Sequence, residues 1–124
     1  MKYFNYCNSI FYVIYGLFGA FAPLSLASVL GWKLTHLGQH EMRAYCLFIS
    51  AVGIILFLGT QKTNDQKIVL KSIIFITFSF LAGRILGLVL DGPGPTLTYL
   101  EILFETALIS LGLVLLKQKK EIIR

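Results

Sequence analysis

Four long runs of apolar residues dominate the chain. They cover residues 3–22, 41–59, 68–90 and 96–116, and shorter polar or glycine- and proline-containing stretches separate them. A transmembrane helix needs about 20 mostly apolar residues, and a helix satisfies its own backbone hydrogen bonds in lipid. The alternating segments of about ten residues that are typical of a membrane barrel do not recur. The pattern predicts an all-α membrane protein, an up-down four-helix transmembrane bundle formed by a single domain, residues 1–124.

The segment between the first two runs is longer than the other connections and only half apolar. Its sequence SLASVLGWKL is compatible with a short interfacial helix, with Trp32 and Lys33 at the level of the lipid head groups. It is equally compatible with a re-entrant cap over the outer end of the bundle. The first run also ends in the tripeptide AFA, which resembles a signal-peptide cleavage site. Pro23 would follow that cut and the run is rich in aromatic residues, so a retained helix is favoured.

Composition and charge agree with a bilayer and add an orientation. The chain is 56% hydrophobic and 14% charged, with a mean hydropathy of +0.78, whereas about a quarter of the residues of a soluble domain are charged. The N-terminus, the loop at 61–67 and the C-terminus share one side, which carries eight bases and two acids. Lys and Arg are enriched on the cytoplasmic side. Both termini are therefore predicted to be cytoplasmic, and the basic tail KQKKEIIR indicates a contact with anionic lipid rather than with nucleic acid.

Three charged residues lie deep inside the last two apolar runs, well away from the ends of their helices. Arg84 lies about 10 Å below the end of its helix at Asp91, and Glu101 and Glu105 lie about 9 Å and about 15 Å into the next helix. The two glutamates are four residues apart and share one helix face. A lone charge at a helix centre costs about 2.5–3.5 kcal/mol on insertion, and a guanidinium pairs well with a carboxylate. We therefore expect Arg84 to pair with Glu101 or Glu105.

Two further charged residues, Glu41 and Arg43, are predicted to open the second helix within its first turn, at the same outer level. The candidate polar cluster is Arg84, Glu101, Glu105, Asp91, Glu41 and Arg43. The cluster has three interpretations: a clamp between helices, a pocket for a lipid head group or another small anionic molecule, and a proton relay or acid–base site. Two neighbouring carboxylates can split their pKa values and act as acid and base. His36 and His40 join a proton path in the last case and are otherwise ordinary interface residues.

Small and sulfur-containing residues add three expectations. Gly83 and Gly87 form a GxxxG motif, which lets two helix backbones approach, and intrachain packing is favoured over dimerisation. Gly16, with Gly19 and Ala20, is expected to act similarly on the first helix. Cys7 and Cys46 are predicted to lie near opposite membrane faces as free thiols, because a disulfide needs Cα atoms within about 7 Å. Without a CxxC motif or a Cys/His cluster, no metal site, cofactor or catalytic residue is predicted.

Two stretches resemble a known family. HEMRAYCLFISAVGIILFLG is similar to the second helix, and AGRILGLVLDGPGPTLTYLEILFE to the third and fourth helices, of small bacterial four-helix membrane proteins classed as a domain of unknown function. In overall look these are similar to DoxX-like proteins. Cys46 and Leu47 depart from the pattern, since small residues are expected after the tyrosine. The resemblance implies a multi-pass protein of the bacterial inner membrane and the polar set above, and it implies no activity.

The sequence is compatible with three functions. The first is a non-enzymatic membrane protein, either an accessory subunit of a partner or a binder of membrane lipid or a small amphiphile, with a homodimer as one arrangement. The second is a small proton-coupled transporter, which would need an oligomer because four helices without repeats are few for a complete pathway. The third is a membrane-embedded isomerase or lipid-modifying enzyme that uses Glu101 or Glu105. The first is favoured because the chain shows a charge cluster without a nucleophile, metal-ligand set or nucleotide motif.

Overall fold

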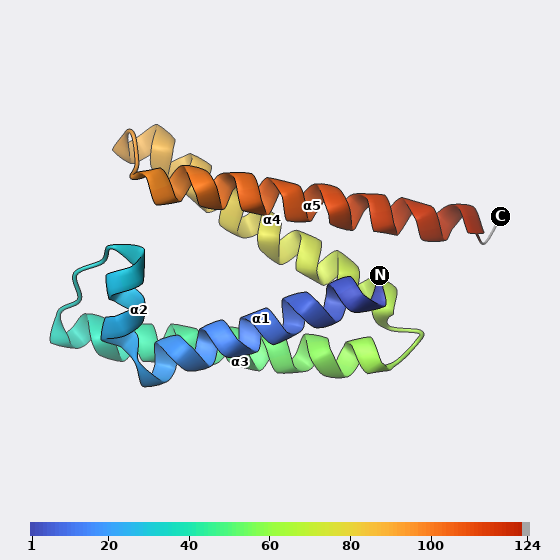
Figure 1. The fold of residues 1–124 in the computed structure, drawn as a ribbon, viewed down its shortest axis with the longest axis horizontal. Coiled ribbons are helices and arrows are strands. Elements are labelled where there is room, and N and C mark those ends of the chain that lie inside the picture. The colour runs from blue at the N-terminus through green and yellow to red at the C-terminus, as the bar shows by residue number, and fades with distance from the viewer. Residues whose placement is uncertain (123–124) are drawn as a thin grey trace. The chain divides into compact units, whose positions relative to one another are not determined.

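The computed structural model describes the backbone of residues 1–122 as a chain of α-helices (Figure 1). It describes the side chains of residues 1–118. In this part of the chain no β-strand occurs, as predicted. The helices are α1 (Lys2–Phe21), α2 (Pro23–Leu30), α3 (His36–Gln61), α4 (Gln66–Asp91) and α5 (Thr96–Ile122). Helices α1, α2 and α3 belong to one compact unit, Lys2–Thr63, and helices α4 and α5 belong to a second unit that starts at Asn64.

The chain is a multi-pass membrane protein by the length and hydropathy of its helices. Within the described residues, α3, α4 and the stretch Thr96–Gln118 of α5 are long and apolar enough to cross a bilayer. Helices α1 and α2 meet this requirement only as a pair, which is bent by 112° where they join, so the protein has three candidate spans, or four if the bent pair counts as one. The first predicted span is therefore confirmed as a helix, and it reaches the length and hydropathy of a span only together with α2.

Helices α1 and α3 pack along each other through glycine and serine. A Cβ atom on Gly16 would lie 2.6 Å from the backbone nitrogen of Ser50, and one on Gly53 would lie 2.9 Å from the carbonyl oxygen of Ser9. The Ser50 hydroxyl donates a hydrogen bond of 2.9 Å to the Val13 carbonyl across the helix pair. Only residues without a bulky side chain allow backbones to approach this closely. The packing role predicted for Gly16 is confirmed, and the pair is antiparallel.

The burial pattern of these helices is the reverse of a water-soluble protein. Asn5, Ser9 and Thr60 are fully buried, whereas Tyr3 and Phe21 are 84% and 78% exposed. The buried hydroxyls of Ser9 and Thr60 donate to carbonyls four residues earlier in their own helices, which gives each hydroxyl hydrogen an acceptor. In lipid, helices associate through small and polar residues and leave large apolar side chains to the acyl chains. The pattern therefore supports a bilayer environment for α1 as well as for α3.

The predicted short helix after the first run is confirmed as α2. Pro23 stands in its first turn, where the missing N–H is tolerated. The helix ends at Gly31, whose φ of 74° is left-handed, and Trp32 donates its backbone N–H to the Ala27 carbonyl at 2.8 Å. This is a common way for a glycine to end a helix. Leu26 and Ala27 are buried in a core cluster with residues of α1 and α3, so α2 folds back onto the helix pair.

The start of α3 differs from the sequence-based expectation. The helix begins at His36 instead of residue 41, because the Thr35 side chain accepts a hydrogen bond of 3.0 Å from the Gly38 backbone N–H and caps the helix. The first turn of α3 is polar, so it lies outside the apolar run that predicted the helix. The prediction that Glu41 and Arg43 lie in the first turn is wrong, since both follow it.

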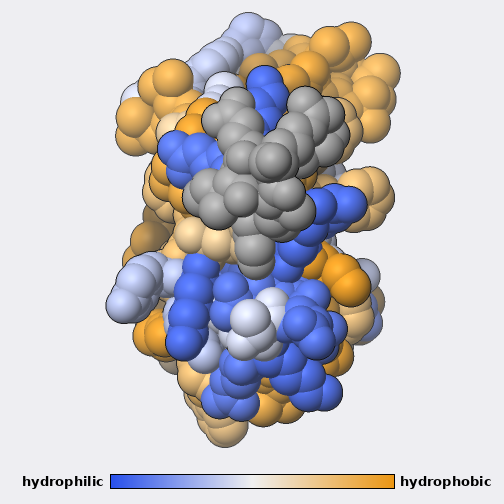
Figure 2. All heavy atoms as spheres, turned by 90° about the vertical axis from the view of Figure 1, so that its right-hand side faces the viewer, coloured by the Kyte–Doolittle hydropathy of each residue, from blue (hydrophilic) through white to orange (hydrophobic). Residues whose placement is uncertain are grey.

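Helices α4 and α5 form the second unit, an antiparallel pair. Gly112 of α5 lies against α4, since a Cβ atom there would come within 2.8 Å of Ile74 Cγ1. The two helices are joined by residues 92–95, where Gly92 has a φ of 88° that favours glycine. At the other end of α4, hydrophilic residues gather around the α3–α4 turn, with hydrophobic residues on the helix flanks (Figure 2). Polar residues thus occur at helix ends, as a bilayer requires.

Candidate functional site

The antiparallel packing of α4 and α5 places the intramembrane charges opposite each other. Arg84 precedes the last residue of α4, Asp91, by seven residues, which is about 10 Å along the helix. Glu101 and Glu105 follow the first residue of α5 by five and nine residues. Because the connection is only four residues long, positions at similar distances from it lie side by side. The local sequence therefore determines that these charges meet.

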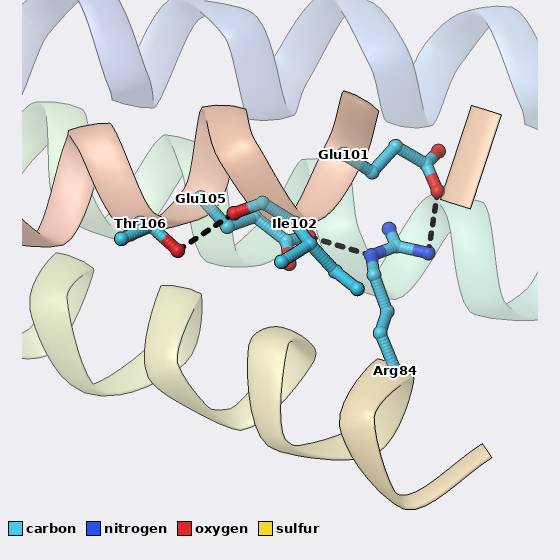
Figure 3. A network of polar contacts seen from close by, with 5 residues as sticks. All are labelled: Arg84, Glu101, Ile102, Glu105 and Thr106. Carbon is cyan, nitrogen blue, oxygen red and sulfur yellow. Dashed lines mark hydrogen bonds and ion pairs between the residues drawn. The ribbon is translucent and has the colours of Figure 1, made fainter. Parts of the chain in front are cut away.

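Arg84 contacts both glutamates, as Figure 3 shows. Its Nη1 atom lies 2.7 Å from Glu101 Oε2, and its Nε atom donates to Glu105 Oε1 at 2.9 Å. The expectation that Arg84 pairs with one of the two is confirmed and extended to both. The guanidinium lies between two carboxylates that are four residues apart on α5. We call these three residues, Arg84, Glu101 and Glu105, the triad.

Burial in the triad is uneven. The side chain of Glu105 is 10% exposed, compared with 30% for Arg84 and 26% for Glu101. Glu105 Oε2 is buried and has no hydrogen-bond partner among the described residues. A buried carboxylate oxygen without a donor is costly, and one guanidinium balances only one of the two carboxylates. The triad therefore carries one negative charge in excess when all three groups are ionised.

A groove of about 500 Å³ runs along α4 beside the triad and reaches the α4–α5 connection. Its lining residues are Ser79, Phe80, Gly83, Arg84, Gly87, Leu88, Asp91, Gly92, Pro93, Gly94 and Thr98. Asp91 and Thr98 lie at the end that reaches the connection, and Phe80 lies about three helical turns further along α4. The groove thus has an acidic and hydroxyl-bearing end at the connection, and along α4 it is lined by glycine and apolar residues together with Arg84 and Ser79. Pockets with apolar walls and a few polar groups are typical of ligand sites.

The glycines of the GxxxG motif form part of this groove instead of a helix contact. A Cβ atom on Gly83 would meet no atom within 4 Å, and one on Gly87 would meet only Asp91 Oδ2, at 4.0 Å. Within the α4–α5 unit, the motif therefore does not provide the intrachain close packing that was expected of it. Gly83 and Gly87 have no side chain, and the space that a side chain would occupy at either position is part of the groove.

Some lining residues were not recognised in the sequence. Ser79 and Thr98 contribute hydroxyl groups to the groove wall, although the Ser79 hydroxyl donates to the Phe75 carbonyl. Thr98 follows the sequence DGPGP closely, and a polar residue so near a turn is a weak signal that occurs in many loops. The groove itself depends on how the turn folds against α4, which no local pattern reveals.

Glu41 and Arg43 belong to the unit of α1, α2 and α3, and Arg43 has a structural contact there. Its Nη1 atom donates to the carbonyls of Ala20, at 2.5 Å, and Phe21, at 3.5 Å, at the end of α1. These carbonyls lack intrahelical partners, and a cation is favoured at a helix C-terminus. Arg43 therefore stabilises the bend between α1 and α2. Glu41 is exposed and forms no ion pair or side-chain hydrogen bond with another described residue.

The chain has two histidines, His36 and His40, and two cysteines, Cys7 and Cys46. His36 Nε2 and His40 Nε2 lie 3.2 Å apart, with the rings edge to face, on the exposed start of α3. Cys7 is exposed, Cys46 is buried, and both are free thiols, as predicted. Within the described residues no group of three or more His, Cys, Asp or Glu side chains is placed to hold a metal ion. The triad and the groove remain the strongest candidate site.

Comparison with known proteins assigns a family without a function. A family model described as a domain of unknown function, DUF4345, matches residues 2–116. The chain belongs to the DUF4345 family. No curated protein and no solved structure matches it. The matched range contains the triad, the groove and Arg43, so the candidate site lies entirely within the DUF4345 domain. The family description names no activity.

Proposed function

We propose that this DUF4345 protein is a non-enzymatic binder of a membrane lipid or small amphiphile, located in a bacterial inner membrane. The groove carries the proposal. It has a carboxylate and a hydroxyl group at the α4–α5 connection, and along α4 it is lined mainly by glycine and apolar residues, with Arg84 and Ser79 among them. An amphiphile has the same order of parts, a polar head followed by an apolar chain. The clamp between α4 and α5 is compatible with this role, since the triad also keeps one wall of the groove in place.

A blocking substitution tests the proposal. Gly83 lines the groove and has free space around it, so Gly83→Leu is expected to fill the groove without disturbing α4. Ala82 is exposed and does not line the groove, which makes Ala82→Leu the matched control. We expect wild type and Ala82→Leu to retain a bound amphiphile through purification in a mild detergent, and Gly83→Leu to retain about tenfold less. Native mass spectrometry measures the retention.

The opposite result would remove the basis for the proposal. If Gly83→Leu and Ala82→Leu retain the same species in the same amount, the bound molecule does not occupy the groove. The triad would then act only as a clamp between α4 and α5. Circular dichroism of both variants checks that the helix content is unchanged, so that loss of the amphiphile is not a consequence of unfolding.

Orientation in the membrane is part of the proposal and has its own test. We propose that both termini and the α3–α4 turn are cytoplasmic, because the flanking segments on this side carry most of the bases. In a Cys7→Ser, Cys46→Ala background, a cysteine at Pro93 is expected to react with a membrane-impermeant maleimide in intact spheroplasts. Cysteines at Tyr3 and Thr63 are expected to react only after permeabilisation. Labelling of Tyr3→Cys in intact spheroplasts would show that α1 and α2 do not form a span.

A further inference from the structure

The α4–α5 pair is short of positive charge. Between Lys71 and Lys117 the sequence has one basic residue, Arg84, and three acidic residues, Asp91, Glu101 and Glu105. The Nε and Nη1 atoms of Arg84 already contact the two glutamates. No described residue forms an ion pair or a hydrogen bond with the Asp91 side chain. Three acids against one base give the region a net negative charge, and the exposed Asp91 carboxylate is accessible to a cation.

The position of Asp91 strengthens this electrostatic argument. Asp91 is the last residue of α4, and the last turn of this helix contains no basic residue. The C-terminus of a helix carries a partial negative charge, so an acidic side chain there is unfavourable and a cation is favourable. Asp91 therefore does not stabilise α4. Together with the last carbonyl groups of the helix, it forms a site of negative potential at the polar end of the groove.

The side chain of Asp91 is also directed along the groove. Its Oδ2 atom lies 4.0 Å from the place where a Cβ on Gly87 would stand, so the carboxylate leans back over the preceding turn of α4. Both residues line the groove, and so does Thr98. A head group at this end meets a carboxylate and a hydroxyl group. The bare backbone at Gly87 leaves room for it.

We propose that the groove binds an amphiphile through an ammonium head group held by Asp91, a specification that rests on the proposed function. An ammonium group has three N–H donors, and Asp91 and the last carbonyls of α4 are acceptors. The apolar chain lies over Gly87 and Gly83 and reaches Phe80. An anionic head group, which Arg84 alone would suggest, meets the Asp91 carboxylate in the groove and a guanidinium that is already in ion pairs with Glu101 and Glu105. The net negative charge of the region therefore favours an ammonium head group over an anionic one.

Two amphiphiles with the same chain test the sign of the head group. The full-length protein in a nonionic detergent is mixed with equal concentrations of dodecylammonium and dodecyl phosphate, and native mass spectrometry measures the bound ratio. We expect wild type to retain about tenfold more dodecylammonium than dodecyl phosphate. Asp91→Asn is expected to reduce the ratio to about one, because the amide keeps the shape and loses the charge. Glu41→Gln removes the same charge at an exposed position in the other unit and is expected to keep the wild-type ratio.

The outcomes separate this inference from the function on which it rests. Equal binding of both amphiphiles by wild type, a preference for dodecyl phosphate, or an unchanged ratio in Asp91→Asn overturns the ammonium proposal. If Gly83→Leu binds neither amphiphile, the groove remains the binding site in all of these cases. If Gly83→Leu binds both as well as Ala82→Leu does, the proposed function itself fails. A parallel mixture of phosphatidylethanolamine and phosphatidylglycerol identifies the source: retention of the former supports a bilayer lipid, and retention of dodecylammonium alone supports a single-chain amine.

Discussion

Arg84→Leu is expected to lower the free energy of unfolding by about 3–5 kcal/mol, the usual cost of breaking a buried ion pair from one side. The substitution leaves Glu105, whose side chain is 10% exposed, without its cation, and leaves Glu101 unpaired beside it. Two neighbouring carboxylates then repel each other in apolar surroundings. Unfolding by increasing fractions of sodium dodecyl sulfate in mixed micelles, followed by circular dichroism, measures the change.

A compensating variant separates the loss of the ion pairs from the loss of packing. Arg84→Leu combined with Glu101→Gln and Glu105→Gln removes all three charges, and we expect it to recover more than half of the lost stability. Replacing a complete buried ionic group is often close to neutral, whereas removing one partner is not. Equal stability of Arg84→Leu and the triple variant would show that the triad contributes through the shape of Arg84 and not through its charge.

Gly16→Leu is expected to destabilise the protein by about 2–3 kcal/mol, the upper part of the usual cost of overpacking. A side chain at Gly16 meets the backbone of Cys46 and Ser50, which moves only if the whole helix moves. Separating α1 from α3 also breaks the hydrogen bond from Ser50 to the Val13 carbonyl. The same unfolding titration in mixed micelles measures the effect.

Gly83→Leu is the matched control for this substitution, since it makes the same change at a glycine with free space around it. Its stability is expected to stay within about 0.5 kcal/mol of wild type, as for most substitutions that meet no neighbour. Two glycines of one chain, both on apolar helices, thus have opposite expected effects. A large loss of stability in Gly83→Leu would mean that this face of α4 is packed against protein and is not an open groove wall.

The two units contain different kinds of charged contact. Arg43 donates to the carbonyls at the end of α1 and supports the bend into α2. Arg84 pairs with two carboxylates of a neighbouring helix. The two arginines look alike in sequence, since each lies in a candidate span with acidic residues nearby. The structure distinguishes a residue that caps a helix end from one that lines a groove.

The sequence alone determined the helical architecture and the pairing of Arg84. Both follow from quantities that are local to one or two helices. A run of about 20 apolar residues is long enough to cross a bilayer, and a charge inside such a run needs a partner at the same depth. Depth is proportional to residue number in a helix. The short connection between α4 and α5 therefore predicted which glutamates Arg84 meets.

The tertiary structure alone decided how each helix is rotated about its axis, and with it which glycines pack against a neighbouring helix. The use of Gly16 for packing and of Gly83 for an open groove depends on how each helix is rotated about its axis, and in an evenly apolar span the hydropathy pattern does not define that rotation. The early start of α3 depends on a hydrogen bond to the Thr35 side chain. Arg43 contacts the carbonyls of Ala20 and Phe21 because antiparallel packing places the first half of α3 beside the end of α1. These features arise from contacts between distant positions, and so the groove became visible only in the folded chain.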